Sequence, residues 1–242
     1  MKITELQKDL AATFRWTARL NMNEGVANHF SACVPGSSHD FYVNKAGVHF
    51  SQIKASDLIL VTKKNIDELR NKPEIVDSTA INIHGTIHEK VPHAKCIFHV
   101  HSKYSTALST LKNATLPPID QNTMRFFNRV SIYNEFGGMG FEDESVKMAN
   151  ALGNKQHMLL ANHGVITTGK TVSEGFDALY YFEKSAETYL TALSTNQELN
   201  VVSDEIAEKT AQEWANYPSD MARAHLDQIR LILDKEEPDY KN

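Results

Sequence analysis

The sequence predicts a mixed α/β or α+β fold in which helices flank a sheet of about seven to nine strands. Between residues 27 and 61 the apolar residues form short runs separated by turn residues, whereas later segments repeat them with helical spacing. The composition, 41% hydrophobic and 23% charged, is that of a globular chain able to bury a full core. We therefore expect one domain over residues 1–242, with its core at about 5–215.

The first half of the chain predicts one helix followed by a meander of strands. Leu6, Leu10 and Phe14 recur at four-residue steps in a helix over residues 5–23 that stops near Gly25. Proline, glycine, serine and lysine separate the apolar runs that follow, which is typical of antiparallel strands joined by turns. These runs are 30–34, 41–43, 48–50 and 58–61.

The second half alternates helices with extended segments. Residues 79–90 have an apolar helical side and lead through Pro92 into the strand that ends in His99-Val100-His101. For residues 216–242 we expect a C-terminal helix and a polar tail that is frayed from Lys235 onward. Further helices are expected at 103–111, 142–153, 172–194 and 203–215, and extended segments at 130–133 and 157–167.

Charge and composition narrow the class of partner. A net charge of −5 and a pI near 6.1 give no electrostatic reason to expect nucleic acid or an anionic membrane surface, so a small-molecule or protein partner is expected. The N-terminus is too charged for a signal peptide and no apolar stretch is long enough to span a bilayer, so we expect a cytoplasmic protein. Cys33 and Cys96 lie in apolar segments and are expected to be buried reduced thiols.

A His-x-His pair marks the candidate site. Side chains two apart on a strand point to the same face, so His99 and His101 can bind one cation. His163 ends a second apolar run, at Asn162-His163-Gly164, and is the candidate third ligand. Three neutral imidazoles favour zinc, iron or a similar ion over magnesium or calcium. The alternative is that the pair is simply two half-exposed strand residues.

Several motifs follow one another in a fixed order along the chain, namely Ala27-Asn28-His29-Phe30-Ser31, Pro35-Gly36, Gly47 to Leu58, His84-Gly85-Thr86-Ile87-His88, His99-Val100-His101, Gln121-Asn122 and Asn162-His163-Gly164. Together they make the chain similar to the class II aldolase/adducin family, and the likeness runs from about residue 5 to residue 215. The resemblance implies an αβα fold around a mainly antiparallel sheet, and a homotetramer with active sites at subunit interfaces. It also implies one divalent ion on His99, His101 and His163, with zinc expected first and iron or manganese as alternatives.

The chain departs from the family pattern at one position. The sugar-phosphate aldolases of the family carry a proton-transferring glutamate on the helix before the His-x-His strand, and the matching position here is Ala80. An alanine cannot carry a proton, so poor sugar-phosphate aldolase activity is expected. The resemblance places four residues where those aldolases bind the substrate phosphate, namely Asn28, Gly47, Ser78 and Thr79.

Six further residues are weighed for a role. Tyr133 precedes a Phe-Gly pair, as does a proton-donating tyrosine in some aldolases. His29 is either a replacement for the missing proton carrier or a histidine that hydrogen-bonds the backbone. His84 is expected to pack behind the site on its helix. The charges of Glu183, Lys184 and Glu187 are expected at a solvated or subunit-facing edge of the long helix 172–194.

The leading functional hypothesis is a metal-dependent lyase that cleaves or decarboxylates a small hydroxy-acid, keto-acid or sugar-derived substrate. A non-catalytic, adducin-like module for cytoskeletal or actin-type protein interaction is the first alternative. The second alternative is an iron-dependent oxygenase-like enzyme on the same fold, because three histidines leave coordination positions open.

Overall fold

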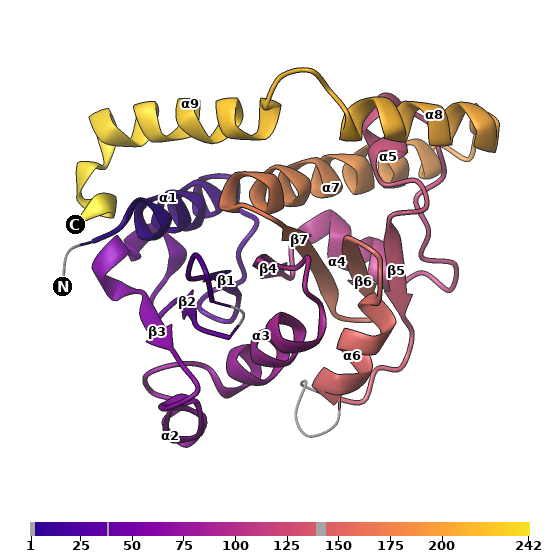
Figure 1. The fold of residues 1–242 in the computed structure, drawn as a ribbon. Coiled ribbons are helices and arrows are strands. Elements are labelled where there is room, and N and C mark those ends of the chain that lie inside the picture. Colours follow the sequence, from indigo (N-terminus) through magenta and orange to yellow (C-terminus); the bar gives the residue numbers. More distant parts are fainter. Residues whose placement is uncertain (1–2, 38, 139–143) are drawn as a thin grey trace.

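The computed structural model describes residues 3–37, 39–138 and 144–242, and within them a seven-stranded sheet lies between layers of helices (Figure 1). The order across the sheet is β3-β2-β1-β4-β7-β6-β5. β5 and β6 run parallel and the other neighbours antiparallel, so the sheet is mixed and mainly antiparallel, as the sequence predicts. The strands are β1 (His29–Cys33), β2 (Phe41–Val43), β3 (Ile59–Val61), β4 (Cys96–Val100), β5 (Val130–Tyr133), β6 (His157–Leu160) and β7 (Gly164–Gly169).

Helices cover both faces of this sheet, which confirms the predicted α/β class. α1 (Glu5–Arg19) and α7 (Val172–Leu193) lie on one face, and α3 (Ser78–Lys90) and α6 (Glu144–Leu152) lie on the other (Figure 1). Residues 142–143 of the helix expected at 142–153 lie outside the described residues. The remaining helices are α2 (Ile66–Arg70), α4 (Lys103–Ser109), α5 (Gln121–Arg125), α8 (Asp204–Ala215) and α9 (Met221–Glu236).

The strand expected at 48–50 is wrong, because the chain turns there into a 3-10 helix, Phe50–Gln52. The ring of His49 starts this turn, since its Nδ1 accepts a hydrogen bond from the backbone N–H of Ser51 at 3.2 Å. Phe50 is fully buried and packs edge-on against Phe14, with ring centres 4.7 Å apart. Its apolar character reflects this core contact and not a place in the sheet.

The C-terminal tail is packed against the body of the molecule, so the expectation that it frays from Lys235 is wrong. Tyr240 is fully buried and its hydroxyl donates to Asp234 at 3.0 Å. The buried guanidinium of Arg15 in α1 pairs with Glu237 at 3.1 Å and with Asp239 at 3.0 Å. Two acidic residues that look like solvated tail in the sequence therefore satisfy a buried arginine.

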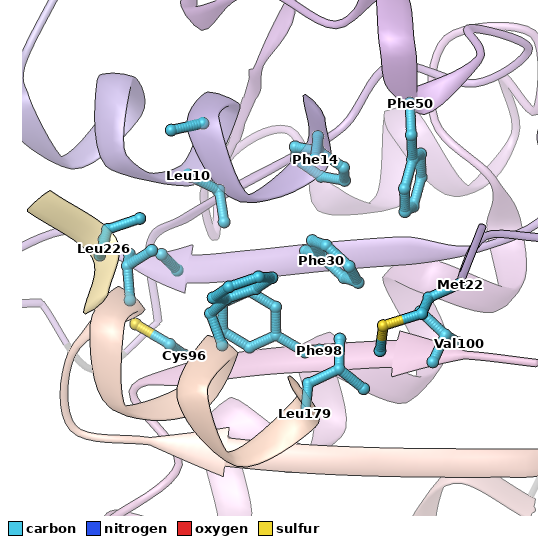
Figure 2. Close-up of a cluster of buried hydrophobic side chains, with 14 of the residues drawn as sticks. Leu10, Phe14, Met22, Phe30, Phe50, Cys96, Phe98, Val100, Leu179 and Leu226 are labelled. Atoms are coloured by element: carbon cyan, nitrogen blue, oxygen red, sulfur yellow. The ribbon is translucent and has the colours of Figure 1, made fainter. Parts of the chain in front are cut away.

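An aromatic cluster between the sheet and helices α1 and α7 fixes the position of β1 beside β4 (Figure 2). Phe30 stacks on Phe14 at 4.6 Å and contacts Phe98 at 4.7 Å between ring centres. Because strand side chains alternate between faces, the residues next to Phe30 in β1 and next to Phe98 in β4 point to the other face of the sheet, toward α3. His29 and His99 are register partners on these two strands, so both imidazoles point toward α3 at one end of the sheet.

Candidate metal centre

The three predicted histidines meet at this end of the sheet. His99 closes β4, His101 follows it, and His163 lies in the turn between β6 and β7. Each ring offers one ligand nitrogen, and these three nitrogens all lie within 4.8 Å of one another. His99 is buried and the other two are partly exposed, so the cluster opens to the surface of this chain. The proposed ligand set is therefore one group in space.

Hydrogen bonds fix which nitrogen of two rings faces the cluster. Nδ1 of His99 lies 3.0 Å from the carbonyl oxygen of Val165, and Nδ1 of His101 lies 2.6 Å from a carboxylate oxygen of Glu24. Both partners can only accept, so each Nδ1 carries a proton, and in the neutral form of each ring Nε2 keeps its lone pair. Residues of this kind behind metal-binding imidazoles orient them and hold their tautomers.

The two Nε2 atoms approach to 3.0 Å. Two lone pairs this close repel each other unless a proton or a metal cation lies between them. Nitrogens about 2.0–2.1 Å from one tetrahedral ion lie about 3.3 Å apart, which is near the observed separation. The donor set and its spacing therefore fit a divalent ion of the zinc or iron type.

Burial favours the neutral, ligand-competent form of His99 and His163. Burial first, and the neighbouring imidazoles second, lower the pKa of His99 well below the ordinary value and that of His163 to about 4. Neutral rings are the form that binds metal ions.

His29 lies beside this cluster, with its ring centre 4.9 Å from that of His99. Its Nδ1 is 2.7 Å from Nε2 of His84, which projects from α3 and is fully buried. His29 is therefore bonded to a histidine side chain, and His84 packs behind the site as the sequence predicts. Burial lowers the pKa of His29 to about 4, against an opposing effect of the Asp77 carboxylate.

The position expected for a catalytic glutamate, Ala80, lies one helical turn before His84 in α3. Ala80 is 1% exposed and packs in an apolar cluster with residues of β1, β2 and β3. Asp77 is the nearest upstream carboxylate, and it accepts from the backbone N–H of Thr79 at 2.7 Å as the cap of α3. The structure thus gives Asp77 a capping role.

The four candidate phosphate-binding residues are spread over three segments. Thr79 donates its hydroxyl to Asp77 at 2.6 Å, and Ser78 donates to the carbonyl of Arg70 at 3.2 Å. Gly47 is exposed in a turn with a positive φ of 71°. Asn28 is 1% exposed, and its amide nitrogen is buried without a hydrogen-bond partner among the described residues. Of the four, Asn28 precedes His29 directly and so lies nearest the cluster along the chain.

Tyr133 ends β5 and is 6% exposed within an apolar cluster beside α6. Burial and the nearby Glu144 carboxylate raise its pKa, so the phenol keeps its proton. Among the described residues Tyr133 makes no hydrogen bond to the three histidines. Phe136, just beyond the strand, is 54% exposed with its ring centre 6.4 Å from that of His163.

Two glutamates support the site, although the sequence alone predicts this role for neither of them. Glu24, in the loop after α1, holds His101 as described above. Glu183 of α7 is 7% exposed and not at a solvated edge. Its carboxylate accepts from the backbone N–H groups of Tyr104 at 2.8 Å and Ser105 at 2.9 Å, at the start of the helix that follows His101. It also accepts from the hydroxyls of Ser102 and Ser105, each at 2.6 Å.

A family model described as the class II aldolase and adducin N-terminal domain matches residues 8–190. The chain belongs to the class II aldolase and adducin family. An aldolase II superfamily protein from Pseudomonas syringae shares 28% identity, with a TM-score of 0.86 over 98% of this chain and 95% of that one. An L-fuculose 1-phosphate aldolase from Glaciozyma antarctica shares 26% identity, with a TM-score of 0.81 over 98% and 92%.

A relative described as decarboxylase NovR, from Streptomyces niveus, is 29% identical over 67% of this chain and 60% of its own length. Family and fold thus agree with the resemblance drawn from the sequence. Within the described residues, none of the helices combines the length and apolar composition that a bilayer span requires.

Proposed function

We propose that this family member is a metal-dependent lyase that breaks a carbon–carbon bond, by aldol-type cleavage or decarboxylation, in a small hydroxy-acid or keto-acid. The 3.0 Å approach of the lone-pair nitrogens of His99 and His101, with His163 beside them, carries the proposal. A divalent ion held by these rings, with zinc as the first candidate and iron or manganese as alternatives, would supply Lewis-acid stabilisation of the charge on a substrate carbonyl oxygen.

The proton transfer that the family assigns to glutamate falls to His29 in this proposal. Ala80 has no proton to exchange, and His29 is a buried titratable side chain whose ring centre lies 4.9 Å from that of His99, a candidate ligand. In aldol-type cleavage His29 takes the proton of the substrate hydroxyl as the carbon–carbon bond breaks. The electron pair of that bond passes to the neighbouring carbonyl, and Tyr133, whose raised pKa keeps it protonated, is the proposed donor that returns a proton to carbon.

Substrate binding is proposed to use the donors near the start of α3 and β1. The unpartnered amide of Asn28 suits an anionic or carbonyl oxygen. Gly47, Ser78 and Thr79 remain proposed binding residues on the strength of the family pattern. The opening of the histidine cluster at the surface of one chain supports a homotetramer whose neighbouring subunit completes the pocket.

The test is a screen of hydroxy-acids and keto-acids with protein loaded in turn with zinc, iron or manganese, read by carbon dioxide release and by proton NMR of the products. Turnover that is absent in His163→Ala and kept in His93→Ala, a histidine away from the cluster, supports the lyase. L-fuculose 1-phosphate should be a poor substrate because Ala80 cannot move a proton. Rapid cleavage of that sugar phosphate would contradict this expectation from Ala80.

A non-catalytic adducin-like binding role is the second candidate, and Ala80 favours it. It predicts that no stoichiometric metal binds and that no acid is turned over under any loading. Oxygen consumption that depends on iron loading, with no carbon–carbon cleavage when oxygen is absent, would instead indicate oxygenase-like chemistry.

A further inference from the structure

A chain of buried hydrogen bonds leads from His29 away from the metal centre into the layer between β1 and α3. Nδ1 of His29 lies 2.7 Å from Nε2 of His84, and Nδ1 of His84 bonds to the hydroxyl oxygen of Ser31. That oxygen lies 2.8 Å from Nε2 of His88, whose Nδ1 lies 2.8 Å from the carbonyl oxygen of Ala94. The four side chains are between 0% and 3% exposed, so water cannot replace any link.

The last link gives the whole chain a direction. The carbonyl of Ala94 can only accept, so Nδ1 of His88 carries a proton and its Nε2 accepts from Ser31. Ser31 has one hydroxyl proton, which it gives to His88, so it must accept from Nδ1 of His84. Nε2 of His84 is then an acceptor, and Nδ1 of His29 is the donor to it. Each neutral ring fixes the tautomer of the next.

We propose that His84, Ser31 and His88 are positioning residues that hold His29 in its Nδ1–H tautomer, so that its Nε2 presents a lone pair to substrate at the three-histidine centre. This inference rests on the proposed function for the role of His29 as a base, but the tautomer itself does not depend on turnover. The opposite tautomer would place a proton on Nε2, and His29 could then not accept one there.

Reversing the chain has a physical cost that a simple packing cluster would lack. With every proton moved to the other nitrogen, the lone pair of His88 Nδ1 would face the lone pairs of the Ala94 carbonyl at 2.8 Å, and the Cys33 thiol, 3.2 Å from the same nitrogen, is only a weak donor to it. When substrate gives its proton to Nε2 of His29, the O–H bond breaks and the N–H bond forms. The resulting imidazolium keeps its Nδ1–H bond to His84, which is an acceptor and so stabilises the charged ring.

The test is nitrogen-15 NMR of the full chain with labelled histidine, which separates protonated from unprotonated ring nitrogens. The signals of His29 are assigned by their loss in His29→Gln. We expect protonated Nδ1 and unprotonated Nε2 in His29, His84 and His88 of the wild type. Ser31→Ala removes the link between His84 and His88, so His29 should change from one tautomer to a mixture. Ser31→Thr keeps the hydroxyl and should keep the single tautomer.

A proton on Nε2 of His29 in the wild type, or a His29 tautomer that Ser31→Ala leaves unchanged, would overturn the inference. If Ser31→Ala does not fold, the wild-type tautomers of the three rings decide the question alone. The predicted tautomers together with no turnover of any acid would contradict the lyase proposal but support the inferred chain of hydrogen bonds. Turnover of an acid together with a proton on Nε2 of His29 would support the lyase proposal but contradict the inferred chain. In an active protein, Ser31→Ala should lower kcat more than it changes KM, with recovery in Ser31→Thr.

Discussion

Adding one methyl group at Gly164 should damage the metal centre more than it damages the fold. Gly164 follows His163 at the start of β7. A Cβ there would lie 2.4 Å from the carbonyl oxygen of Val100 and 3.1 Å from the ring of His101. Ordinary contacts of this kind are 3.4 Å or more, so β4 and β7 must separate by about 1 Å, which moves His101 away from His163.

Gly169→Ala, at the other end of the same strand, provides a matched control. Its Cβ would lie 2.3 Å from the backbone nitrogen of Gly175, a clash of similar severity away from the histidines. Overpacking should lower the free energy of unfolding by about 1–3 kcal/mol in each variant. Because metal–ligand distances tolerate only about 0.2 Å, Gly164→Ala should also lose at least about tenfold in zinc affinity.

The assay is competition for zinc against a chromophoric chelator, with urea unfolding of the same samples. The prediction is equal loss of stability in the two variants and loss of affinity in Gly164→Ala alone. Unchanged zinc affinity in a folded Gly164→Ala protein would refute the reasoning, because the histidines would then not form the site as described.

Three further perturbations test the surroundings of the site. Glu183→Ala leaves four donors at the start of α4 unpaired, so urea unfolding should show a free energy of unfolding lower by about 3 kcal/mol. The control Glu187→Ala removes only an exposed ion pair with Lys184 and should lower it by less than about 0.5 kcal/mol. Glu24→Gln keeps an acceptor for His101 and Glu24→Ala does not, so zinc affinity should fall about tenfold or more only in the alanine variant. Equal zinc affinities of the two variants would contradict the role of Glu24 in orienting His101. Burial lowers the pKa of His157 from 6.5 to about 3, so between these pH values the unfolded chain binds more protons than the folded one. The free energy of unfolding should therefore fall by about 1.4 kcal/mol per pH unit for this group as the pH falls below 6.5. In urea unfolding at several pH values, His157→Gln should show a shallower dependence of the unfolding free energy on pH, and an unchanged dependence would rule this group out.

The sequence predicts the parts of the site that depend on local pattern. His99 and His101 follow from strand alternation, and His163 from its matching place at the end of an apolar run. Strand spacing fails at residues 48–50, where burial of Phe50 against α1 produces the same apolar pattern as a strand. Such patterns record that a residue is buried but not which element buries it.

The supporting residues depend on register between distant segments and leave no local trace. Ser31 meets His84 and His88 because β1 lies under α3, and nothing in a Ser on a strand indicates a partner more than fifty residues away. Glu183 sits in a helix among other charges, so its burial appears only once α4 is packed against α7. Glu24 is 64% exposed at its side chain and looks like an ordinary loop residue until His101 is placed beside it.

Metal content is the measurement that tests the central claim most directly. Purified protein, before and after reconstitution with zinc, iron or manganese, should contain about one ion per chain by elemental analysis. That ion should be lost in His99→Ala and in His163→Ala and kept in His93→Ala. No stoichiometric ion in the wild type under any of these conditions would contradict the metal centre and leave the adducin-like binding role as the better account.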